Sequence, residues 1–470
     1  MSIPGLGSEA TYEDSLKLVS IPQGSEWRIE VPFKQILKFK VTEGILEING
    51  TELPNNVELQ LTGTKCSIYS PKQQSKIEYN LVQNHDMSMY EDDEFTEYTS
   101  NETNMESVLN LHMYIESKRQ IASDHNVSNE EPTLGPRVLI LGGKQSGKTS
   151  LAKTLVSYAV KMNQYPILVN LNPQDGVFAL PGSISATVIN DSLDVECCNG
   201  YGLTTTTTGG NASSSKQPIV KNYGFTAIKQ NLDLYKYQIE QLGITVLSRL
   251  EQDLQCRDSG VVVDTPALGI KDFEVIEAIV GDFRIDIIVV LGNEKLTIDL
   301  KKKLSHKSNL QIVKLNKSPG VVEVSDKFIR MSQESTIREY FNGNFKTRLS
   351  PFKTDIDATG LQIYKAVQDS VSLSFLPAGE DFERDDEKDN DLNKYYSAMD
   401  PSPSNVDNSI IVVTHLQSST PGKDLLNSSV LGYIHVSKYD EEKKKLKVLL
   451  PFPGVFPRNV LISTDIGYNE

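Results

Sequence analysis

The sequence predicts a chain of several domains: an N-terminal β-sandwich, a central α/β domain with a parallel sheet, and a small C-terminal α+β domain. Three observations carry this prediction. Runs that alternate apolar and polar residues lie between Trp27 and Leu81, and this period is typical of half-buried strands. From Pro136 apolar strands alternate with helices, as in a parallel sheet. Strand-like segments return after residue 409.

The N-terminal strands come in short bursts such as WRIEV, ILKFKVT and IEYNL, separated by turn residues. This spacing predicts an antiparallel sandwich with one face of each sheet buried, and Trp27, the only tryptophan, is expected in its core. Residues 88–106 show neither the helical nor the strand period. The predicted domain therefore covers residues 1–104 and ends in an acidic connector.

A connecting helix and linker are predicted over residues 105–134. The helix, residues 105–122, has amphipathic spacing that places the following residues near one face: Val108, Leu109, His112 and Ile115. The next residues, 123–135, are polar and are expected to form a linker.

The central domain is predicted over residues 135–345. Its helix covers residues 149–163, and its buried strands are expected at 137–141, 165–171, 260–266 and 283–292. Residues 198–217 are of low complexity, so we expect a mobile surface loop there.

The C-terminal domain is predicted over residues 346–470. Its strands are expected at 410–416, 431–440, 445–451 and 460–464. An acidic, proline-containing stretch, residues 376–408, is expected to be a disordered insertion because it is too polar to pack.

The chain has 470 residues, with 47 Lys and Arg against 62 Asp and Glu, and a formal net charge of −15. Most of this excess lies in two places: residues 88–106 carry seven acids and no base, and residues 376–400 carry nine acids and three bases. The rest is close to neutral, which excludes a uniformly basic protein that coats nucleic acid. No apolar run reaches 18 residues and the N-terminus has no secretory pattern, so no membrane association is expected.

The cysteines and histidines predict no metal site. The cysteines form no CxxC pair or dense framework, so reduced, buried or incidental thiols are expected at Cys66, Cys197, Cys198 and Cys256. The six histidines have no HxH or HExxH spacing. The lysine runs 301–303 and 443–445 are more typical of solvated faces than of nucleic-acid contacts.

The motif that carries chemistry is GGKQSGKT, residues 142–149, which fits G-x-x-x-x-G-K-[ST] between a buried strand and a helix. In such a P-loop the backbone N–H groups and the helix N-terminus cradle phosphate. Lys148 is expected to reach the β- and γ-phosphates, and Thr149 to ligate Mg²⁺. The predicted nucleotide-binding residues of this motif are Gly142, Gln145, Ser146, Gly147, Lys148, Thr149 and Ser150.

The second half of such a site is a carboxylate at a strand end, where it would hold the water shell of Mg²⁺. VVVDTP places Asp264 at one strand end, and an ordinary turn cap is the alternative there. ILVNLNPQ places Asn170 and Asn172 at another. An amide cannot accept a proton, so Asn172 cannot deprotonate an attacking hydroxyl. The predicted metal ligands are therefore Thr149 and Asp264.

The sequence resembles the Clp family of pre-mRNA cleavage-complex subunits, which are relatives of polynucleotide 5′-hydroxyl kinases, and is most similar to fungal subunits of cleavage factor IA. The segments that carry this resemblance are IPQGSEWRIEV (21–31), GPRVLILGGKQSGKTSL (135–151), VNLNPQDGVFALPGSISAT (169–187), QPIVKNYG (217–224), GVVVDTP (260–266), TIREYFNG (336–343) and LKVLLPFPGVFP (446–457). Together they extend along almost the whole chain.

The resemblance implies a β-sandwich, a P-loop NTPase or kinase-like domain and a small C-terminal domain, with bound ATP and Mg²⁺. It implies that the N-terminal domain closes over adenine through Glu26 and Lys65, which otherwise pass for surface charges at strand edges. It also implies a nuclear subunit whose central domain binds the cleavage factor IA subunit that carries the RNA polymerase II tail-interaction module. Other 3′-end processing factors are further implied partners, and any RNA contact is expected to be indirect.

Three departures from the active kinases of this family separate two functions. Asn172 stands where they carry Asp, Ala267 and Leu268 fall in the T-x-G-W clasp, and Val324 and Ile329 replace two lid arginines. The chain thus lacks a base, an aromatic platform and the guanidinium groups that neutralise a transferred phosphoryl. The first hypothesis is a nucleotide-holding, catalytically inactive subunit required for cleavage in polyadenylation-dependent mRNA 3′-end formation.

Two alternatives remain open. The chain could be an active RNA 5′-hydroxyl kinase, an ATP-dependent enzyme in which Gln174 or Asp175 replaces the lost base. It could also be a GTPase-like switch, because DTPALG (264–269) weakly resembles the switch loop of a GTPase.

Overall fold

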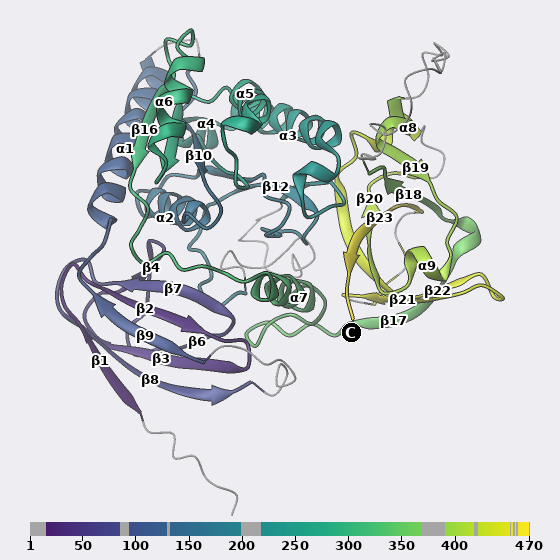
Figure 1. Ribbon diagram of the computed structural model, residues 1–470, viewed down its shortest axis with the longest axis horizontal. Helices are drawn as coiled ribbons and strands as arrows, with labels where there is room; N and C mark the ends of the chain where they lie inside the picture. Colours follow the sequence, from purple (N-terminus) through teal and green to yellow (C-terminus); the bar gives the residue numbers. More distant parts are fainter. Residues whose placement is uncertain are drawn as a thin grey trace, which may run out of the picture. The chain divides into compact units, whose positions relative to one another are not determined.

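The computed structural model describes residues 16–84, 94–128, 132–198, 218–368, 391–417, 422–451, 453–454, 456 and 459–469. The chain divides into two compact units, residues 1–103 and 104–470 (Figure 1). No helix within the described residues is both long enough and apolar enough to cross a membrane. The predicted acidic segments 88–93 and 376–390, and residues 199–217 of the predicted loop, lie outside the described residues.

The first unit is a β-sandwich, as predicted. One sheet has the order β1-β8-β3-β6, with bounds Lys17–Ile21, Ser75–Gln83, Gln35–Glu43 and Glu58–Leu61. The other has the order β5-β4-β7-β2-β9, with bounds Thr51–Glu52, Glu47–Ile48, Thr64–Tyr69, Glu26–Val31 and Thr96–Ser100. Alternate residues of β2 enter the core, and Trp27 is fully buried there, as expected, with its ring 5.2 Å from that of Tyr79.

Strand β9 corrects the prediction that the acidic connector has no secondary structure. It pairs antiparallel with β2, and its Glu97 accepts a 2.7 Å hydrogen bond from Trp27 Nε1 and another from the Tyr79 hydroxyl. The sequence TEYTS has no apolar alternation, because this strand joins the sandwich through backbone pairing and these buried polar contacts. Hydrophobic periodicity therefore could not reveal it.

The second unit begins with helix α1, Met105–Ser128, which is longer than predicted. It continues through residues 123–128, which had been assigned to the polar linker. Its buried residues are Val108, Leu111, His112, Ile115, Arg119 and Ala122. The prediction is confirmed for Val108, His112 and Ile115 and is wrong for Leu109, which is exposed. Arg119 can be buried because its Nε donates a 2.9 Å hydrogen bond to the carbonyl of Ser259 and its Nη1 pairs with Glu116.

The central sheet has the order β13-β12-β11-β14-β10-β15-β16. Strands β11, β14, β10 and β15 are parallel, as predicted. Three further strands were not predicted: β16, which is also parallel, and β12 and β13, which are antiparallel at one edge. In the order of the sheet, the bounds of the strands are Ile219–Asn222 (β13), Ser183–Val188 (β12), Ile167–Asn170 (β11), Val261–Asp264 (β14), Arg137–Gly142 (β10), Ile287–Leu291 (β15) and Gln311–Leu315 (β16). The helices of this part are α2 (Lys148–Lys161), α3 (Leu232–Gln252), α4 (Leu254–Ser259), α5 (Phe273–Asp282), α6 (Glu294–Lys303) and α7 (Asp326–Asn342).

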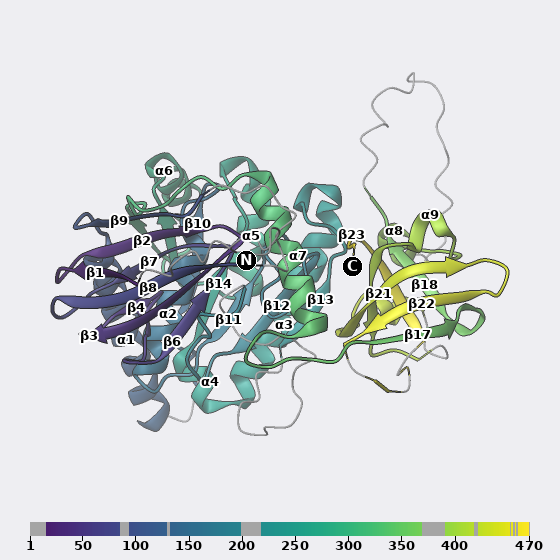
Figure 2. The same ribbon diagram turned by 90° about the horizontal axis from the view of Figure 1, so that it is seen from below.

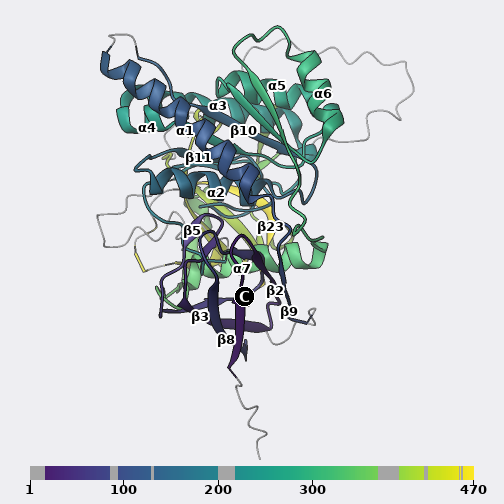
Figure 3. The same ribbon diagram turned by 90° about the vertical axis from the view of Figure 1, so that its left-hand side faces the viewer.

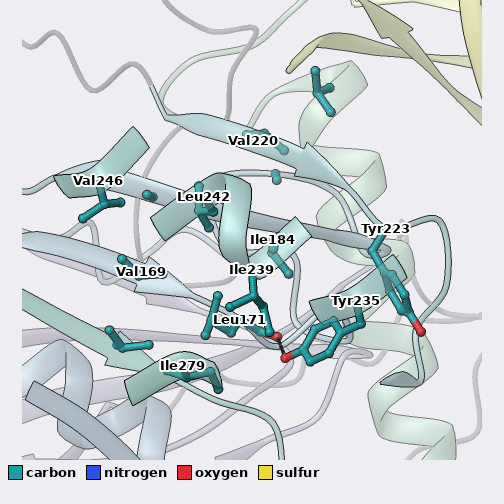
Figure 4. Close-up of a cluster of buried hydrophobic side chains, with 14 of the residues drawn as sticks. Val169, Leu171, Ile184, Val220, Tyr223, Tyr235, Ile239, Leu242, Val246 and Ile279 are labelled. Carbon is teal, nitrogen blue, oxygen red and sulfur yellow. Dashed lines mark hydrogen bonds between the residues drawn. The ribbon is translucent and has the colours of Figure 1, made fainter. Parts of the chain in front are cut away.

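The two faces of this sheet are covered by different helices. Val138 and Ile140 of β10 pack with α1 and α2, which lie beside each other (Figure 3). Leu139 and Leu141 face the opposite cluster, which includes the apolar residues of α3 and α5 (Figure 4). Because successive residues of a strand point to opposite faces, a strand buried on both sides is continuously apolar, as residues 138–141 of β10 are.

The C-terminal part is a seven-stranded sheet with the order β17-β22-β21-β20-β23-β18-β19 (Figure 2). The four predicted strands are confirmed as β20 (Ser409–Thr414), β21 (Val430–Asp440), β22 (Lys445–Leu450) and β23 (Val460–Gly467). Three strands were not predicted: β17 (Phe352–Asp357), β18 (Gln362–Ala366) and β19 (Tyr396–Ala398). Residues 391–408 also carry α8 (Asp391–Tyr395) and α9 (Pro403–Val406), so the prediction of disorder is wrong for them.

The ordered end of the predicted insertion is held by one buried aromatic side chain and one exposed ion pair. Tyr396 of β19 is 1% exposed, and its hydroxyl donates a 3.1 Å hydrogen bond to the carbonyl of Asn222 on β13. Lys394 pairs with Asp233 at 2.8 Å. The acidic composition of this segment predicted disorder, because the average polarity of a segment does not indicate whether a single side chain such as Tyr396 is buried.

Candidate nucleotide-binding site

The predicted phosphate loop lies between β10, which ends at Gly142, and α2, which begins at Lys148. The loop turns through left-handed backbone at Gly147, with φ 87°, and at Gln145, with φ 52°. Glycine adopts this region freely, whereas a side chain there is uncommon. Gln145 is held in it by its Nε2, which donates a 2.6 Å hydrogen bond to the carbonyl of Val324.

Gly142 and Ser146 close the base of the loop. A Cβ at Gly142 would lie 2.5 Å from Ser146 Oγ and 3.3 Å from Leu291. Ser146 Oγ in turn donates a 3.0 Å hydrogen bond to the carbonyl of Gly143. Gly143 itself has no atom within 4 Å of a Cβ position. The loop is therefore closely packed at Gly142 and has free space beside Gly143.

Lys148 points back into the loop rather than into solvent. Its Nζ donates a 2.8 Å hydrogen bond to the carbonyl of Gly143, and the residue is 8% exposed. Burial lowers the pKa of this ammonium, and the neighbouring carboxylates of Asp264 and Asp175 oppose that shift. A phosphate oxygen in the loop would offer the ammonium a stronger, charge-assisted acceptor than a carbonyl.

Thr149 and Asp264, the two predicted metal ligands, are brought together. Thr149 Oγ1 donates a 2.7 Å hydrogen bond to Asp264 Oδ2 at the end of β14. The other oxygen, Oδ1, is buried and has no hydrogen-bond partner among the described residues. Burial raises the pKa of Asp264 to about 7. A hydroxyl and a carboxylate with a free oxygen suit Mg²⁺, a hard cation that prefers oxygen ligands, and its charge would favour the ionised carboxylate.

Asn172 lies in the turn after β11, where its Oδ1 accepts a 3.3 Å hydrogen bond from the N–H of Gln174. It therefore acts as a turn-forming residue beside the site. Asn170, the other amide considered at this strand end, is 1% exposed and bonds within the same turn, through its Nδ2 to the carbonyl of Asn172.

Asp175 joins the site, although it was predicted only as an alternative base. Burial raises the pKa of its carboxyl, and the nearby side chains of Asn172, Lys153, Lys148 and Thr149 oppose that shift. The signal in the sequence was weak: Asp175 is the only acid in the turn after β11. Its convergence on Thr149 depends on the folded turn and could not be derived from spacing.

The positions that depart from the kinase pattern lie in different surroundings. Leu268 is 2% exposed and belongs to the core, so it offers no platform for a base, while Ala267 is exposed. Val324 contributes its carbonyl to Gln145, and Ile329 is half-buried on α7. Ser150 is exposed in the first turn of α2, where its carbonyl accepts a 2.8 Å hydrogen bond from Thr154 Oγ1.

Glu26 and Lys65 lie on adjacent strands of the sandwich and are both ion-paired. Glu26 accepts a 2.9 Å hydrogen bond from Arg28 Nε and another from the Thr103 hydroxyl, and Lys65 pairs with Glu30 at 2.6 Å. The register places Lys65 opposite Glu30, four residues along β2 from Glu26. The interpretation of these side chains as unremarkable surface charges is therefore wrong for Glu26, which is 2% exposed.

Three segments of the chain match one family. Residues 20–122 match the N-terminal beta-sandwich domain of polyadenylation factor, residues 142–343 match the mRNA cleavage and polyadenylation factor CLP1 P-loop, and residues 349–470 match the pre-mRNA cleavage complex II protein Clp1. The chain belongs to the Clp1 family. This confirms the family inferred from the sequence motifs.

Full-length relatives and solved structures agree with this assignment. The mRNA cleavage and polyadenylation factor CLP1 of Candida albicans is 59% identical, and that of Saccharomyces cerevisiae strain S288c is 35% identical, each with 100% of both chains covered. A wild-type Clp1p–Pcf11p complex matches with a TM-score of 0.82 at 32% identity, covering 97% of this chain and 99% of the other. A second structure, of the extended Pcf11p–Clp1p interface and of ATP loss in a glycine-to-arginine mutant, has a TM-score of 0.82 at 33% identity, covering 97% and 100%.

Proposed function

We propose that this Clp1-family chain is an ATP- and Mg²⁺-binding structural subunit of the pre-mRNA cleavage factor, required for the cleavage that precedes polyadenylation, and that it does not turn ATP over. The observation that carries the proposal is a formed phosphate loop beside Asp264, whose buried Oδ1 has no partner among the described residues. The side of the site where an RNA acceptor would react carries Asn172 and the buried Leu268 in place of a base and an aromatic platform.

In this proposal the residues of the loop bind the charged phosphates and take no part in phosphoryl transfer. On ATP binding, the Lys148 ammonium would exchange its hydrogen bond to the carbonyl of Gly143 for contacts with the β- and γ-phosphate oxygens. Thr149 and Asp264 would hold Mg²⁺, which would help to neutralise the charge of the phosphates. No arginine replaces Val324 or Ile329, so charge developing on a transferred phosphoryl would be poorly stabilised.

The partner that we propose is a Pcf11-type subunit, because solved relatives of the same architecture are complexes of Clp1p with Pcf11p. From the sequence resemblance, we propose that this subunit docks on the central domain and that Glu26 and Lys65 contact the adenine. A cleavage factor acts on pre-mRNA, so we propose nuclear localisation and only indirect contact with RNA. Bound ATP would stabilise the folded chain by RT ln(1 + [L]/Kd), without turnover.

The test is to measure bound nucleotide and its effect on stability. We expect intact ATP in the purified chain by mass spectrometry, and a rise in Tm on adding Mg·ATP that is lost in Lys148→Ala and Thr149→Ala. Lys161→Ala, an exposed lysine at the far end of α2, is the matched control and should keep the rise. Recovery of GTP in place of ATP would support the switch hypothesis. Steady conversion of added ATP to ADP would contradict the structural role.

One observation favours a second candidate, an RNA 5′-hydroxyl kinase. Asp175 interacts with Thr149 and has a raised pKa, which suits a general base. Incubation with 5′-hydroxyl RNA and γ-labelled ATP tests this directly. The kinase hypothesis expects labelled RNA that disappears in Asp175→Asn and Lys148→Ala, whereas the structural hypothesis expects label no higher than in Lys148→Ala.

A further inference from the structure

A second cluster of ionisable side chains lies where the chain leaves the central sheet and meets the C-terminal half of α7. Cys197 and Cys198 follow β12 in sequence, and Glu339 lies in the last turns of α7. The two sulfur atoms and a carboxylate oxygen of Glu339 all lie within 4.8 Å of one another. Residues 141 positions apart are thus brought together by the fold.

The surroundings hold this cluster in place. The N–H of Cys198 donates a 3.0 Å hydrogen bond to Glu339 Oε2, and its thiol lies 3.6 Å from Thr336 Oγ1, one turn earlier on the same face of α7. Glu339 Oε1 accepts a 3.2 Å hydrogen bond from Asn344 Nδ2. Cys197 is 5% exposed. The carboxylate is therefore oriented by its neighbours, and one thiol is shielded from solvent.

The donor set has the character of a site for a soft or borderline cation. Zn²⁺ is bound by thiolate sulfur at about 2.3 Å and by carboxylate oxygen at about 2.0–2.2 Å, usually with four ligands. Two ligand atoms on one tetrahedral ion then lie about 3.5–3.8 Å apart. The three side chains need only a small closure to reach that spacing, and a water molecule can complete the set.

We propose that Cys197, Cys198 and Glu339 form a binding site for Zn²⁺, separate from the nucleotide site. The ion would fasten residues 197–198 to the end of α7, where Lys346 already pairs with Asp194 at 3.2 Å and with Glu196. The other half of α7 reaches the turn after β11, because Gln333 Nε2 donates a 3.0 Å hydrogen bond to the carbonyl of Gln174. The metal would therefore anchor the helix whose N-terminal half borders the phosphate loop.

Proton release accompanies binding at such a site. A cysteine thiol must lose its proton to bind Zn²⁺ as a thiolate. Each ion should release about two protons to the solvent. This signature distinguishes the cluster from a carboxylate site, which would release fewer.

The first test uses the full, reduced and EDTA-treated chain. Titration with Zn²⁺ against a chromophoric chelator should give about one tightly bound ion per chain, with about two protons released. Co²⁺ in its place should give a thiolate-to-metal charge-transfer band, and saturating Mg·ATP should not displace it. The proposal would be overturned by Zn²⁺ uptake below about 0.1 ion per chain or by a Co²⁺ spectrum without thiolate character. It would also be overturned if the cysteines form a disulfide, seen as a loss of two hydrogens by mass spectrometry, and the chain takes up no metal.

The second test uses variants of the three ligands. Cys197→Ser, Cys198→Ser and Glu339→Gln should each weaken Zn²⁺ binding by about 10-fold or more, because outer partners of metal sites alone are worth 10–100-fold. Cys66→Ser, a cysteine of the N-terminal sandwich, is the matched control and should bind as the parent does. Far-UV circular dichroism checks that each variant folds. Equal affinity in all four variants, or an equal loss in Cys66→Ser, would refute the assignment.

Discussion

At the scale of single residues, the nucleotide site contains a carboxyl group whose ionisation opposes folding. Burial raises the pKa of Asp264 to about 7, against a value near 4 in an unfolded chain. Between these values the folded state binds more protons than the unfolded state, so the contribution of Asp264 to stability is present at low pH and is lost as the pH rises through 7.

The variant Asp264→Asn should remove this dependence in nucleotide-free protein. From pH 5 to pH 8 we expect the parent to lose about 2–3 kcal/mol of unfolding free energy relative to the variant. Urea unfolding at several pH values measures the difference. The variant should also lose most of its stabilisation by Mg·ATP. Parallel stability profiles for the two proteins would show that Asp264 does not titrate in this range.

The residues of the phosphate loop could be predicted because their chemistry is local. Eight consecutive residues with fixed spacing specify the loop, and the flanking strand and helix confirm where it lies. Asp175 and the Cys197, Cys198 and Glu339 cluster could not be predicted in this way. Their neighbours come from α2 and from α7, and no spacing in the sequence indicates which helix turn will face them.

At the scale of secondary-structure elements, helix α3 depends on a buried cap. Asn231 Oδ1 accepts a 2.8 Å hydrogen bond from the N–H of Leu234, and Nδ2 donates a 2.7 Å hydrogen bond to the carbonyl of Val367 next to β18. Asn231 is 2% exposed, so water cannot replace these bonds. One side chain thus starts the helix and fastens it to the C-terminal sheet.

Replacement of Asn231 separates these two roles. Asn231→Ala should cost about 2–3 kcal/mol, because an N-cap is worth about 1 kcal/mol and an unpaired buried carbonyl costs a further 1–3 kcal/mol. Asn231→Ser keeps an acceptor for the cap but loses the donor, so its loss should be smaller. Chemical denaturation measures both, and hydrogen exchange should report weaker protection in the first turn of α3 in the alanine variant only. Equal losses in both variants would mean that the cap contributes nothing.

Elements with strong apolar periodicity were the ones that could be predicted. The strands of the central sheet are buried on both faces and read as continuous apolar runs, and β20 to β23 share this property in part. Strands β9, β17 and β19 are short or polar and are held by backbone pairing with stronger neighbours. The predicted face of helix α1 is confirmed except at Leu109, and the burial of Arg119 on that face depends on hydrogen bonds that apolar periodicity does not indicate.

At the scale of the whole molecule, one buried cluster of residues 104–470 contains side chains from both the central and the C-terminal sheet. The largest buried cluster includes residues of β11, α3 and α7 together with Ile410, Val412 and Tyr433 of the C-terminal sheet. Ser183 Oγ and the Tyr433 hydroxyl form a 2.7 Å hydrogen bond, and the hydroxyl of Tyr340 accepts a 2.8 Å hydrogen bond from the N–H of Tyr433. Such a continuous core predicts cooperative unfolding of this unit.

Tyr433→Phe tests this coupling. The change leaves Ser183 Oγ, 1% exposed, without its partner, so we expect a loss of about 1–3 kcal/mol. Tyr439→Phe, on the same strand but in the separate core of the C-terminal sheet, is the matched control and should change stability by less than about 0.5 kcal/mol. In calorimetry the unit 104–470 should still unfold in a single transition, shifted to lower temperature. A split into two transitions, with only the C-terminal one shifted, would show that the central and C-terminal sheets are stabilised independently.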